Sequence, residues 1–125
     1  MTRVSFAEFY GACKERLTER QLKELNPYAL YYLVSGAYIG LEYYAGLGAF
    51  FVWIAVAGND KDWWRVFFRY AHENGVKEIL YCAPDGRGTK SFCHYAGGTI
   101  EQGRQEGMLL CRFETDTRRM NHGRQ

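Results

Sequence analysis

Cys93, His94 and Tyr95 are consecutive, and their side chains are of types that carry out nucleophilic and acid–base chemistry. A thiol becomes a nucleophile when a neighbouring group lowers its pKa, and a phenol can protonate a leaving group. The sequence predicts a short helix over residues 91–95, and adjacent residues of a helix do not face each other. We therefore interpret Cys93 as a core thiol, with a nucleophilic role as the alternative.

Two glycine-containing segments have residues that could bind a phosphate group. Residues 57–63, Ala-Gly-Asn-Asp-Lys-Asp-Trp, precede a predicted helix, and backbone amides at a helix N-terminus attract anions. Gly58, Asn59 and Lys61 are the candidate cofactor-binding residues in this segment. Residues 85–88, Asp-Gly-Arg-Gly, could cradle a phosphate, but this composition is also typical of a plain turn, which we favour.

Aromatic residues make up 17% of the chain and provide candidates for binding a partner. Trp is enriched at binding hot spots, so we expect one of Trp63 and Trp64 to be core and the other to anchor a partner. Stacking of these rings on a base or on coenzyme adenine is the alternative. Tyr43 and Tyr44, with the tyrosines at 31–32, could stack on single-stranded nucleic acid, although cross-strand aromatic pairing is the interpretation we favour.

The overall composition disfavours several functional classes. The net charge of +2, with interleaved signs, disfavours a dedicated nucleic-acid-coating protein. The four cysteines have no zinc-binding spacing, so we expect reduced thiols, no metal and a cytoplasmic protein. The first residues lack a signal-peptide pattern, and the apolar run over 47–57 is shorter than the about 20 residues that span a bilayer.

The elements that must position these residues follow from hydrophobic periodicity and turn residues. Ser5 and Thr18 predict caps of two N-terminal helices, which run to about residues 16 and 25. Three strands over 31–34, 38–44 and 50–57 are expected to form an antiparallel meander. A helix over 63–74, with Asn59 and Asp60 as cap candidates, leads to a strand over 78–83, which is expected to pair in parallel with the strand over 50–57. The short helix over 91–95 and a hairpin of 99–104 and 108–115 complete the order.

This order predicts an α/β (α+β) fold with one domain over residues 1–115 and a basic tail over 116–125. Over roughly residues 30–115 it resembles the GNAT acyltransferase superfamily. The strongest local likeness is residues 88–100, where Phe92 and Gly97 match a family helix that packs Phe-like residues inward and ends at Gly. The resemblance implies a mixed sheet, with a meander followed by strand, helix, strand, helix and hairpin. It also implies that acetyl-CoA would lie between the strands that begin at Phe50 and Glu78.

The chain departs from this family where acetyl-CoA would be held and where the leaving thiolate would be protonated. The family loop has Gln or Arg, then two residues, Gly, one residue, and Gly or Ala, whereas residues 57–63 contain one Gly and two Asp. Cys93 occupies the position at which many members place a Tyr that acts as the general acid. The strand over 50–57 has no Asp or Glu to act as a general base. A further resemblance is to small GNAT-like proteins of short-tailed phages, including internal virion proteins, which can lack the coenzyme A loop.

The sequence therefore predicts a GNAT-like domain without an intact acetyl-CoA loop, and we expect no cofactor and no enzyme activity. Its expected role is to bind a protein partner, or to form a homo-oligomer, through exposed aromatic residues, as a phage or accessory protein of the host cytoplasm or the virion. One alternative is a divergent N-acetyltransferase in which residues 58–62 hold the pyrophosphate and Tyr95 or Cys93 is the acid. The other is a single-stranded nucleic-acid-binding module that uses the Tyr-rich strands and the basic tail.

Overall fold

The computed structural model describes residues 1–102 and 106–116, which form a mixed α/β fold around one sheet. The strands of the sheet are β1 (Thr2–Val4), β2 (Leu30–Val34), β3 (Ala37–Tyr44), β4 (Ala49–Val56), β5 (Glu78–Pro84), β6 (Thr99–Gln102) and β7 (Met108–Glu114). The helices are α1 (Phe6–Cys13), α2 (Glu19–Glu24), α3 (Trp63–Glu73) and α4 (Arg87–Tyr95), with short 3₁₀ turns at Lys14–Arg16 and Ala45–Leu47.

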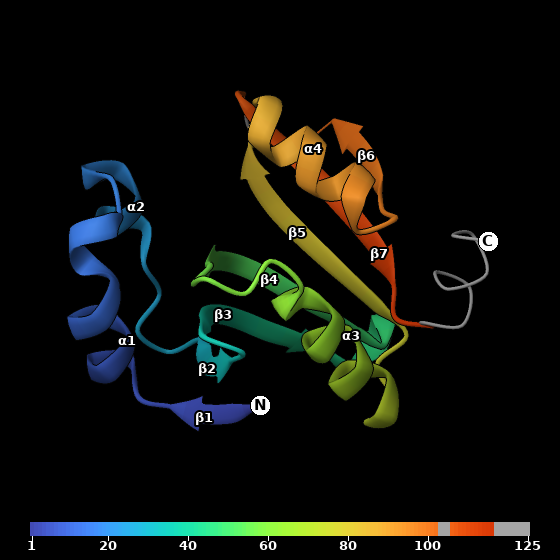
Figure 1. The fold of residues 1–125 in the computed structure, drawn as a ribbon, viewed down its shortest axis with the longest axis horizontal. Helices are drawn as coiled ribbons and strands as arrows, with labels where there is room; N and C mark the ends of the chain where they lie inside the picture. The colour runs from blue at the N-terminus through green and yellow to red at the C-terminus, as the bar shows by residue number, and fades with distance from the viewer. Residues whose placement is uncertain (103–105, 117–125) are drawn as a thin grey trace.

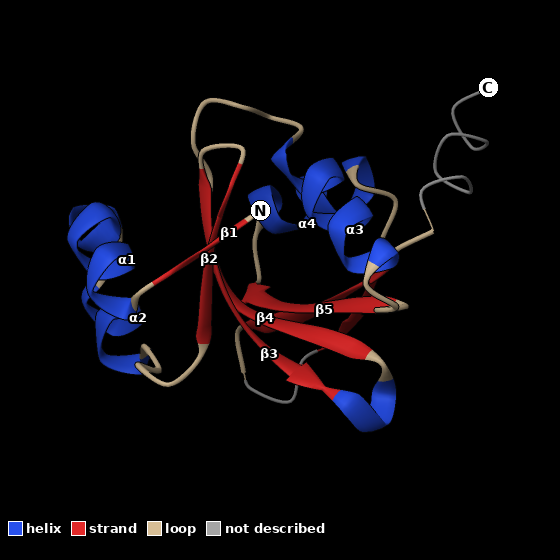
Figure 2. Ribbon diagram, turned by 90° about the horizontal axis from the view of Figure 1, so that it is seen from below, coloured by secondary structure: helices blue, strands red, loops and turns tan. Residues whose placement is uncertain are grey.

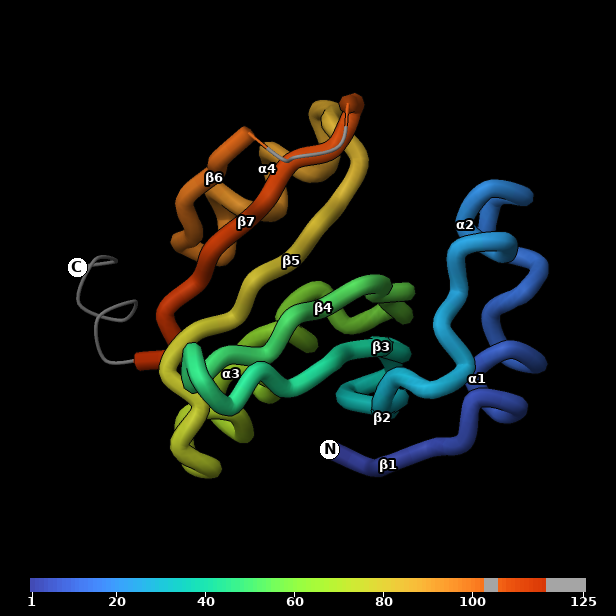
Figure 3. The backbone as a smooth tube through the Cα atoms, turned by 180° about the vertical axis from the view of Figure 1, so that it is seen from behind, coloured from blue at the N-terminus to red at the C-terminus, as the bar shows by residue number. Residues whose placement is uncertain are grey.

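The strand order is β1-β2-β3-β4-β5-β7-β6, so β1 and β6 are the two edges of the sheet (Figure 3). β4 and β5 are parallel, whereas every other neighbouring pair is antiparallel. Helices α1 and α2 lie on one side of the sheet, and α3 and α4 lie on the other (Figures 1 and 2). This arrangement confirms the predicted mixed α/β class and the predicted parallel crossover through α3.

The N-terminal helices form where the capping residues predict them. The Ser5 hydroxyl accepts a hydrogen bond from the Glu8 amide at 3.0 Å, which satisfies one of the free N–H groups of α1. Thr18 and Gln21 form a capping box at the start of α2. The three-residue strand β1 is absent from the prediction because its stability comes from pairing with β2, which local sequence does not reveal.

A β-bulge in β4 determines which of its residues face each of the two hydrophobic cores. Gly40 pairs with Ile54 and Leu41 pairs with Val52, so Trp53 is an extra residue in β4. Because side chains alternate along a strand, this residue reverses the alternation. Val52 packs in the core under α3, whereas Ile54 packs in the core under α1. Because β4 contributes side chains to a hydrophobic core on each face of the sheet, its sequence reads as a continuous apolar run.

β4 and β5 pair over only part of their length. Their register joins Ala49–Val52 to Glu78–Tyr81, and beyond these residues the two strands are no longer paired with each other. Figure 1 shows them diverging from this common end. The facing sides of residues 53–56 and 82–84 therefore have no strand partner between them.

The start of α4 differs from the prediction. This helix begins at Arg87 rather than Ser91, so Arg87 and Gly88 belong to its first turn and not to a loop. The Thr89 hydroxyl donates to the Pro84 carbonyl at 2.6 Å and Lys90 pairs with Asp85 at 3.7 Å, which fastens the first turn to the end of β5. The interpretation of residues 85–88 as a plain turn was therefore wrong in its second half.

The start of α3 also differs, because its N-cap is Asp62 rather than Asn59 or Asp60. Asp60 instead accepts a hydrogen bond from the Asp62 amide at 2.8 Å. The predicted hairpin turn at residues 103–105 and the predicted tail at residues 117–125 lie outside the described residues. Within the described ranges, no helix has the length and apolarity needed to cross a membrane.

Candidate functional site

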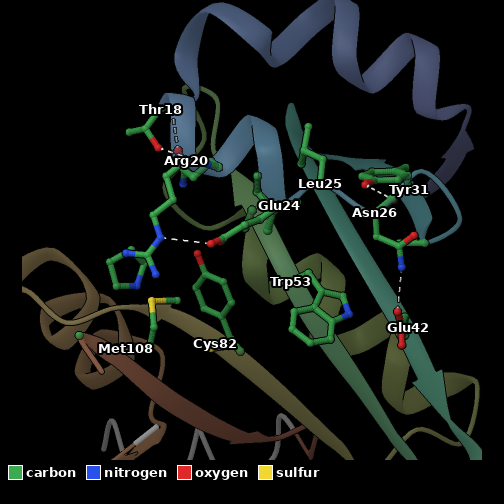
Figure 4. A pocket seen from close by; sticks show the side chains of 17 residues that line it. Thr18, Arg20, Glu24, Leu25, Asn26, Tyr31, Glu42, Trp53, Cys82 and Met108 are labelled. Carbon is green, nitrogen blue, oxygen red and sulfur yellow. Dashed lines mark hydrogen bonds and ion pairs between the residues drawn. The ribbon is translucent and has the colours of Figure 1, made fainter. Parts of the chain in front are cut away.

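A cleft of about 530 Å³ opens where β4 and β5 diverge, on the side of the sheet that carries α2 (Figure 4). Its walls are α2 with the following loop, the outer parts of β3 and β4, the end of β5 and the start of β7. The residues that matter for its chemistry are Arg20, Glu24, Glu42, Trp53, Tyr81 and Cys82. The cleft therefore combines acidic and aromatic side chains with the parts of β4 and β5 that do not pair with each other.

Glu42 of β3 is held in a defined position in this cleft. The Asn26 side-chain amide donates to its Oε1 at 3.1 Å, and the Tyr44 hydroxyl donates to its Oε2 at 3.2 Å. The Tyr31 hydroxyl donates to the Asn26 carbonyl at 2.7 Å, which fixes the loop that carries the amide. Desolvation and the Glu42 carboxylate raise the pKa of Tyr44, so its hydroxyl remains a donor at neutral pH.

Trp53, the bulge residue of β4, supplies the aromatic wall of the cleft. Its side chain is 47% exposed, and its ring lies 4.4 Å from that of Phe51 between centroids. Phe51 lies in turn 5.8 Å from Tyr44, so Tyr44, Phe51 and Trp53 form an aromatic row that leads into the cleft. In Figure 4 the ring nitrogen of Trp53 is on the side of Glu42.

The other charged and titratable groups of the cleft do not form a nucleophilic centre. Arg20 and Glu24 form an exposed ion pair at 3.1 Å. Burial, followed by the charge of Glu24, raises the pKa of the Cys82 thiol. Burial also raises the pKa of Tyr81 to about 12, with smaller contributions from Cys111 and Cys82. Cys82 and Tyr81 are therefore neutral at pH 7, so neither provides a thiolate or phenolate nucleophile in the cleft.

The two candidate acids, Cys93 and Tyr95, do not line the cleft. Cys93 is fully buried, and burial raises its pKa while a contact with Cys111 partly offsets the rise, as expected for a core thiol. The Tyr95 hydroxyl donates to Asp62 at 2.8 Å. This hydrogen bond and desolvation raise the pKa of Tyr95. The structure thus joins Tyr95 to the start of α3 rather than to Cys93.

The candidate cofactor-binding residues surround the start of α3. Asn59 and Lys61 are exposed there. A Cβ on Gly58 would lie 2.6 Å from the Gly36 carbonyl oxygen, so glycine is required for the close approach of the β2–β3 turn. Asp62 accepts hydrogen bonds from Tyr95 and from Arg65, the latter at 3.4 Å. With a second carboxylate at Asp60, this helix N-terminus disfavours a pyrophosphate.

The two tryptophans of α3 are buried, so the prediction that one of them is exposed to anchor a partner was wrong. Trp63 is 8% exposed and Trp64 is fully buried. Packing of α4 against α3 is the cause, since Phe92 stacks 6.0 Å from Trp63 and Tyr95 lies 5.8 Å from Trp64. The ring N–H of Trp64 has no acceptor among the described residues, so Trp64 is held by packing contacts.

Tyr43 and Tyr44 cannot belong to one binding surface, because adjacent residues of a strand point to opposite faces. Tyr43 is 50% exposed and contacts Phe50 on the α3 face. Tyr44 lies on the cleft face, where it bonds to Glu42. Of the predicted partner-binding residues, only Tyr44 adjoins the cleft.

Glu42 and Trp53 are the site residues that the sequence analysis missed. The strand over 50–57 has no carboxylate, whereas Glu42 lies on the neighbouring strand β3 and pairs with Phe51. An acidic residue within an otherwise apolar and aromatic strand was the available indication for Glu42. The exposure of Trp53 depends on which elements cover this face of the sheet, for which the apolar run gave no indication.

No group of three or more His, Cys, Asp or Glu side chains in the described part of the chain is arranged to hold a metal ion. Comparison with models of protein families and with curated protein sequences found no match to this chain.

Proposed function

We propose that this chain is a GNAT-like binding protein that receives an extended segment of a protein partner in the cleft. The observation that carries the proposal is the early end of the β4–β5 pairing, which leaves the facing sides of residues 53–56 and 82–84 without a strand partner between them. Unpaired strand edges bind extended peptides through main-chain hydrogen bonds. The cleft of about 530 Å³ provides the space beside these edges.

The aromatic row supports binding of a protein rather than of nucleic acid. Half-exposed aromatic rings such as Trp53 are typical anchors of protein interfaces. The carboxylates of Glu24 and Glu42 in the same cleft would repel the phosphates of a nucleic acid. The charge of the cleft therefore disfavours a nucleic-acid-binding module.

The GNAT-like part of the proposal is supported by the sheet, in which one parallel pair joins an antiparallel meander to an antiparallel C-terminal part. The proposed function does not include acetyl-CoA chemistry. This is supported by the start of α3, where the carboxylates of Asp60 and Asp62 would repel a pyrophosphate. An accessory or virion role in a phage remains part of the proposal through the resemblance of the sequence.

A divergent N-acetyltransferase is the second candidate function, and one observation favours it. The cleft lies between parallel β4 and β5, where the family resemblance would place acetyl-CoA, and Glu42 provides a carboxylate that could accept a proton from an amine. In that case the acid would have to be a residue other than Cys93, which is fully buried.

Two measurements on the full chain separate these functions. The first is the melting temperature with millimolar acetyl-CoA, which we expect to stay unchanged. A ligand at a hundred times its Kd stabilises the folded state by about 2.7 kcal/mol, so binding would give a clear rise. A rise that follows the acetyl-CoA concentration would favour the enzyme.

The second measurement is photo-crosslinking in a lysate of the native host. A photoreactive amino acid replaces Trp53 in the cleft or, as the matched control, Tyr43 on the opposite face. We expect crosslinks from position 53, with the crosslinked peptides mapping to one extended segment of one partner, and none of these from position 43. Equal crosslinking from both positions, or none from position 53, would contradict the proposed function.

A further inference from the structure

We infer that the segment bound in the cleft is basic, and that one of its lysine or arginine side chains lies against the Trp53 ring and pairs with Glu42. This inference rests on the proposed function and adds the chemistry of the partner to it. It is carried by the charges of the cleft, by the hydrogen bonds of Glu42 and by the exposure of Trp53.

The cleft contains a carboxylate that the described residues do not neutralise. Of the three charged side chains that line it, Arg20 and Glu24 pair with each other at 3.1 Å. No lysine or arginine of the described ranges forms an ion pair with Glu42. The chain as a whole carries a net charge of +2, so the cleft is opposite in sign to the rest of the molecule. Attraction of a cation to this site would therefore be local.

The hydrogen bonds of Glu42 leave room for such a cation. Asn26 and Tyr44 each donate one hydrogen bond, one to each carboxylate oxygen. An ionised carboxylate has about four acceptor sites, so both oxygens can accept again. Neutral donors orient the carboxylate without cancelling its charge, and a half-buried charge of this kind gains from a partner of opposite sign. The same charge would repel an acidic segment.

Trp53 provides the second contact for the cation. Its ring is 47% exposed and lines the same cleft as Glu42. The face of an indole attracts ammonium and guanidinium groups more strongly than other aromatic rings do. The methylene stem of a lysine or arginine can pack on the same ring while its charged end reaches a carboxylate. A lysine or arginine can therefore contact both the Trp53 ring and the Glu42 carboxylate. A neutral polar side chain would gain neither the cation–π contact nor the ion pair.

The test uses short synthetic peptides of equal length in which alternate residues are lysine, glutamate or glutamine. Binding to the full chain is followed by NMR through the indole N–H resonance of Trp53 and the backbone amides. We expect the lysine peptide to bind and to shift the resonances of residues that line the cleft. Its affinity should fall as salt is added. We expect Glu42→Gln and Trp53→Ala each to raise its Kd by about tenfold or more.

Glu42→Gln keeps the size of the side chain and an oxygen that can accept from Asn26 or Tyr44, so we expect the fold to be retained. The matched control is Glu73→Gln, which removes an exposed carboxylate from α3 on the other side of the sheet and should leave the Kd unchanged. Melting temperatures of all variants are measured first, and Trp53→Ala provides the independent test if Glu42→Gln is unstable.

Several outcomes would overturn the inference. One is no binding of the lysine peptide, or binding that Glu42→Gln leaves unchanged. Another is binding of a single-stranded oligonucleotide in the cleft. If the glutamine peptide binds in the cleft as tightly as the lysine peptide, the partner is not selected for charge, but the proposed function stands. If no peptide binds and acetyl-CoA raises the melting temperature, both the inference and the proposed function fail.

Discussion

Replacing Gly40 by alanine should destabilise the protein, because Gly40 lies under an aromatic ring beside the bulge. Gly40 of β3 pairs with Tyr31 of β2. An added Cβ would lie 2.7 Å from the Tyr31 Cε1 and 3.0 Å from the Ile54 Cγ2. Carbon atoms pack at about 3.5–4.0 Å, so the Tyr31 ring would have to move by about 1 Å.

The Tyr31 ring has little freedom to make this movement. It stacks on Phe9 at 4.5 Å, and its hydroxyl donates to the Asn26 carbonyl at 2.7 Å. Overpacking of a core costs about 1–3 kcal/mol, and a weakened hydrogen bond adds about 1 kcal/mol. Alanine is favoured over glycine within a strand by about 0.5–1 kcal/mol. We therefore expect the free energy of unfolding to fall by about 1–3 kcal/mol, which corresponds to about 4–12 °C in Tm.

The assay is urea denaturation followed by tryptophan fluorescence and circular dichroism. The midpoint should fall while the m-value stays constant. The matched control is Gly11→Ala in α1, where an added Cβ has no atom within 4 Å. This control should gain about 0.5–1 kcal/mol, because alanine is the better helix former. A Gly40→Ala protein as stable as the wild type would refute the packing argument.

The Gly40→Ala substitution should also weaken binding of the lysine peptide to the cleft. Tyr31 holds the Asn26 backbone, and the Asn26 side chain holds Glu42, so a displaced Tyr31 ring is expected to loosen the carboxylate. A lost affinity at unchanged stability would point to a different role for Gly40.

Three further predictions concern the packing and hydrogen bonds described above. Trp64→Ala should cost about 3–5 kcal/mol in urea denaturation because it empties a fully buried site, whereas Trp53→Ala should cost less than about 1 kcal/mol; equal costs would contradict the assigned burial. Thr115→Val should cost about 1–3 kcal/mol, because the buried hydroxyl donates at 2.6 Å to a backbone carbonyl that would lose its donor; a neutral effect would show that this bond is replaced. Tyr95→Phe should lower the Tm near neutral pH. Because the bond to Asp62 raises the pKa of Tyr95 above 10.0, this difference should be complete below pH 10.0 and disappear as the pH rises through the raised pKa. A difference in thermal scans that grows with pH would contradict the assigned donor.

Local sequence predicted the elements whose ends are set by their own residues. The capping box at Thr18 starts α2, and the strand and helix order from residue 30 to residue 114 follows the periodicity of apolar residues. The start of α4 was placed too late, because it is fastened by Thr89 and Lys90 to the end of β5, a contact that periodicity does not report. Strand β1 was missed for the same reason, since pairing with β2 stabilises it.

The candidate site was less predictable than the fold. Residue type alone marked Trp63 and Trp64 as binding residues, but burial depends on which helix packs over them, and α4 covers both. Trp53 looked like one residue of a buried strand, but its side chain lines the cleft and is 47% exposed. Glu42 became a site candidate because Asn26, from a loop, and Tyr44, from the same strand, donate hydrogen bonds that orient its carboxylate.

The sequence by itself determined the fold class and the order of the helices and strands apart from β1, because caps, turns and apolar periodicity act over a few neighbouring residues. It also determined that residues 57–63 contain one Gly and two Asp, whatever conformation the segment adopts. Only the tertiary structure decided where a ligand could bind. The cleft exists because β4 and β5 stop pairing after Val52 and Tyr81, and strand pairing depends on contacts between residues far apart in the chain.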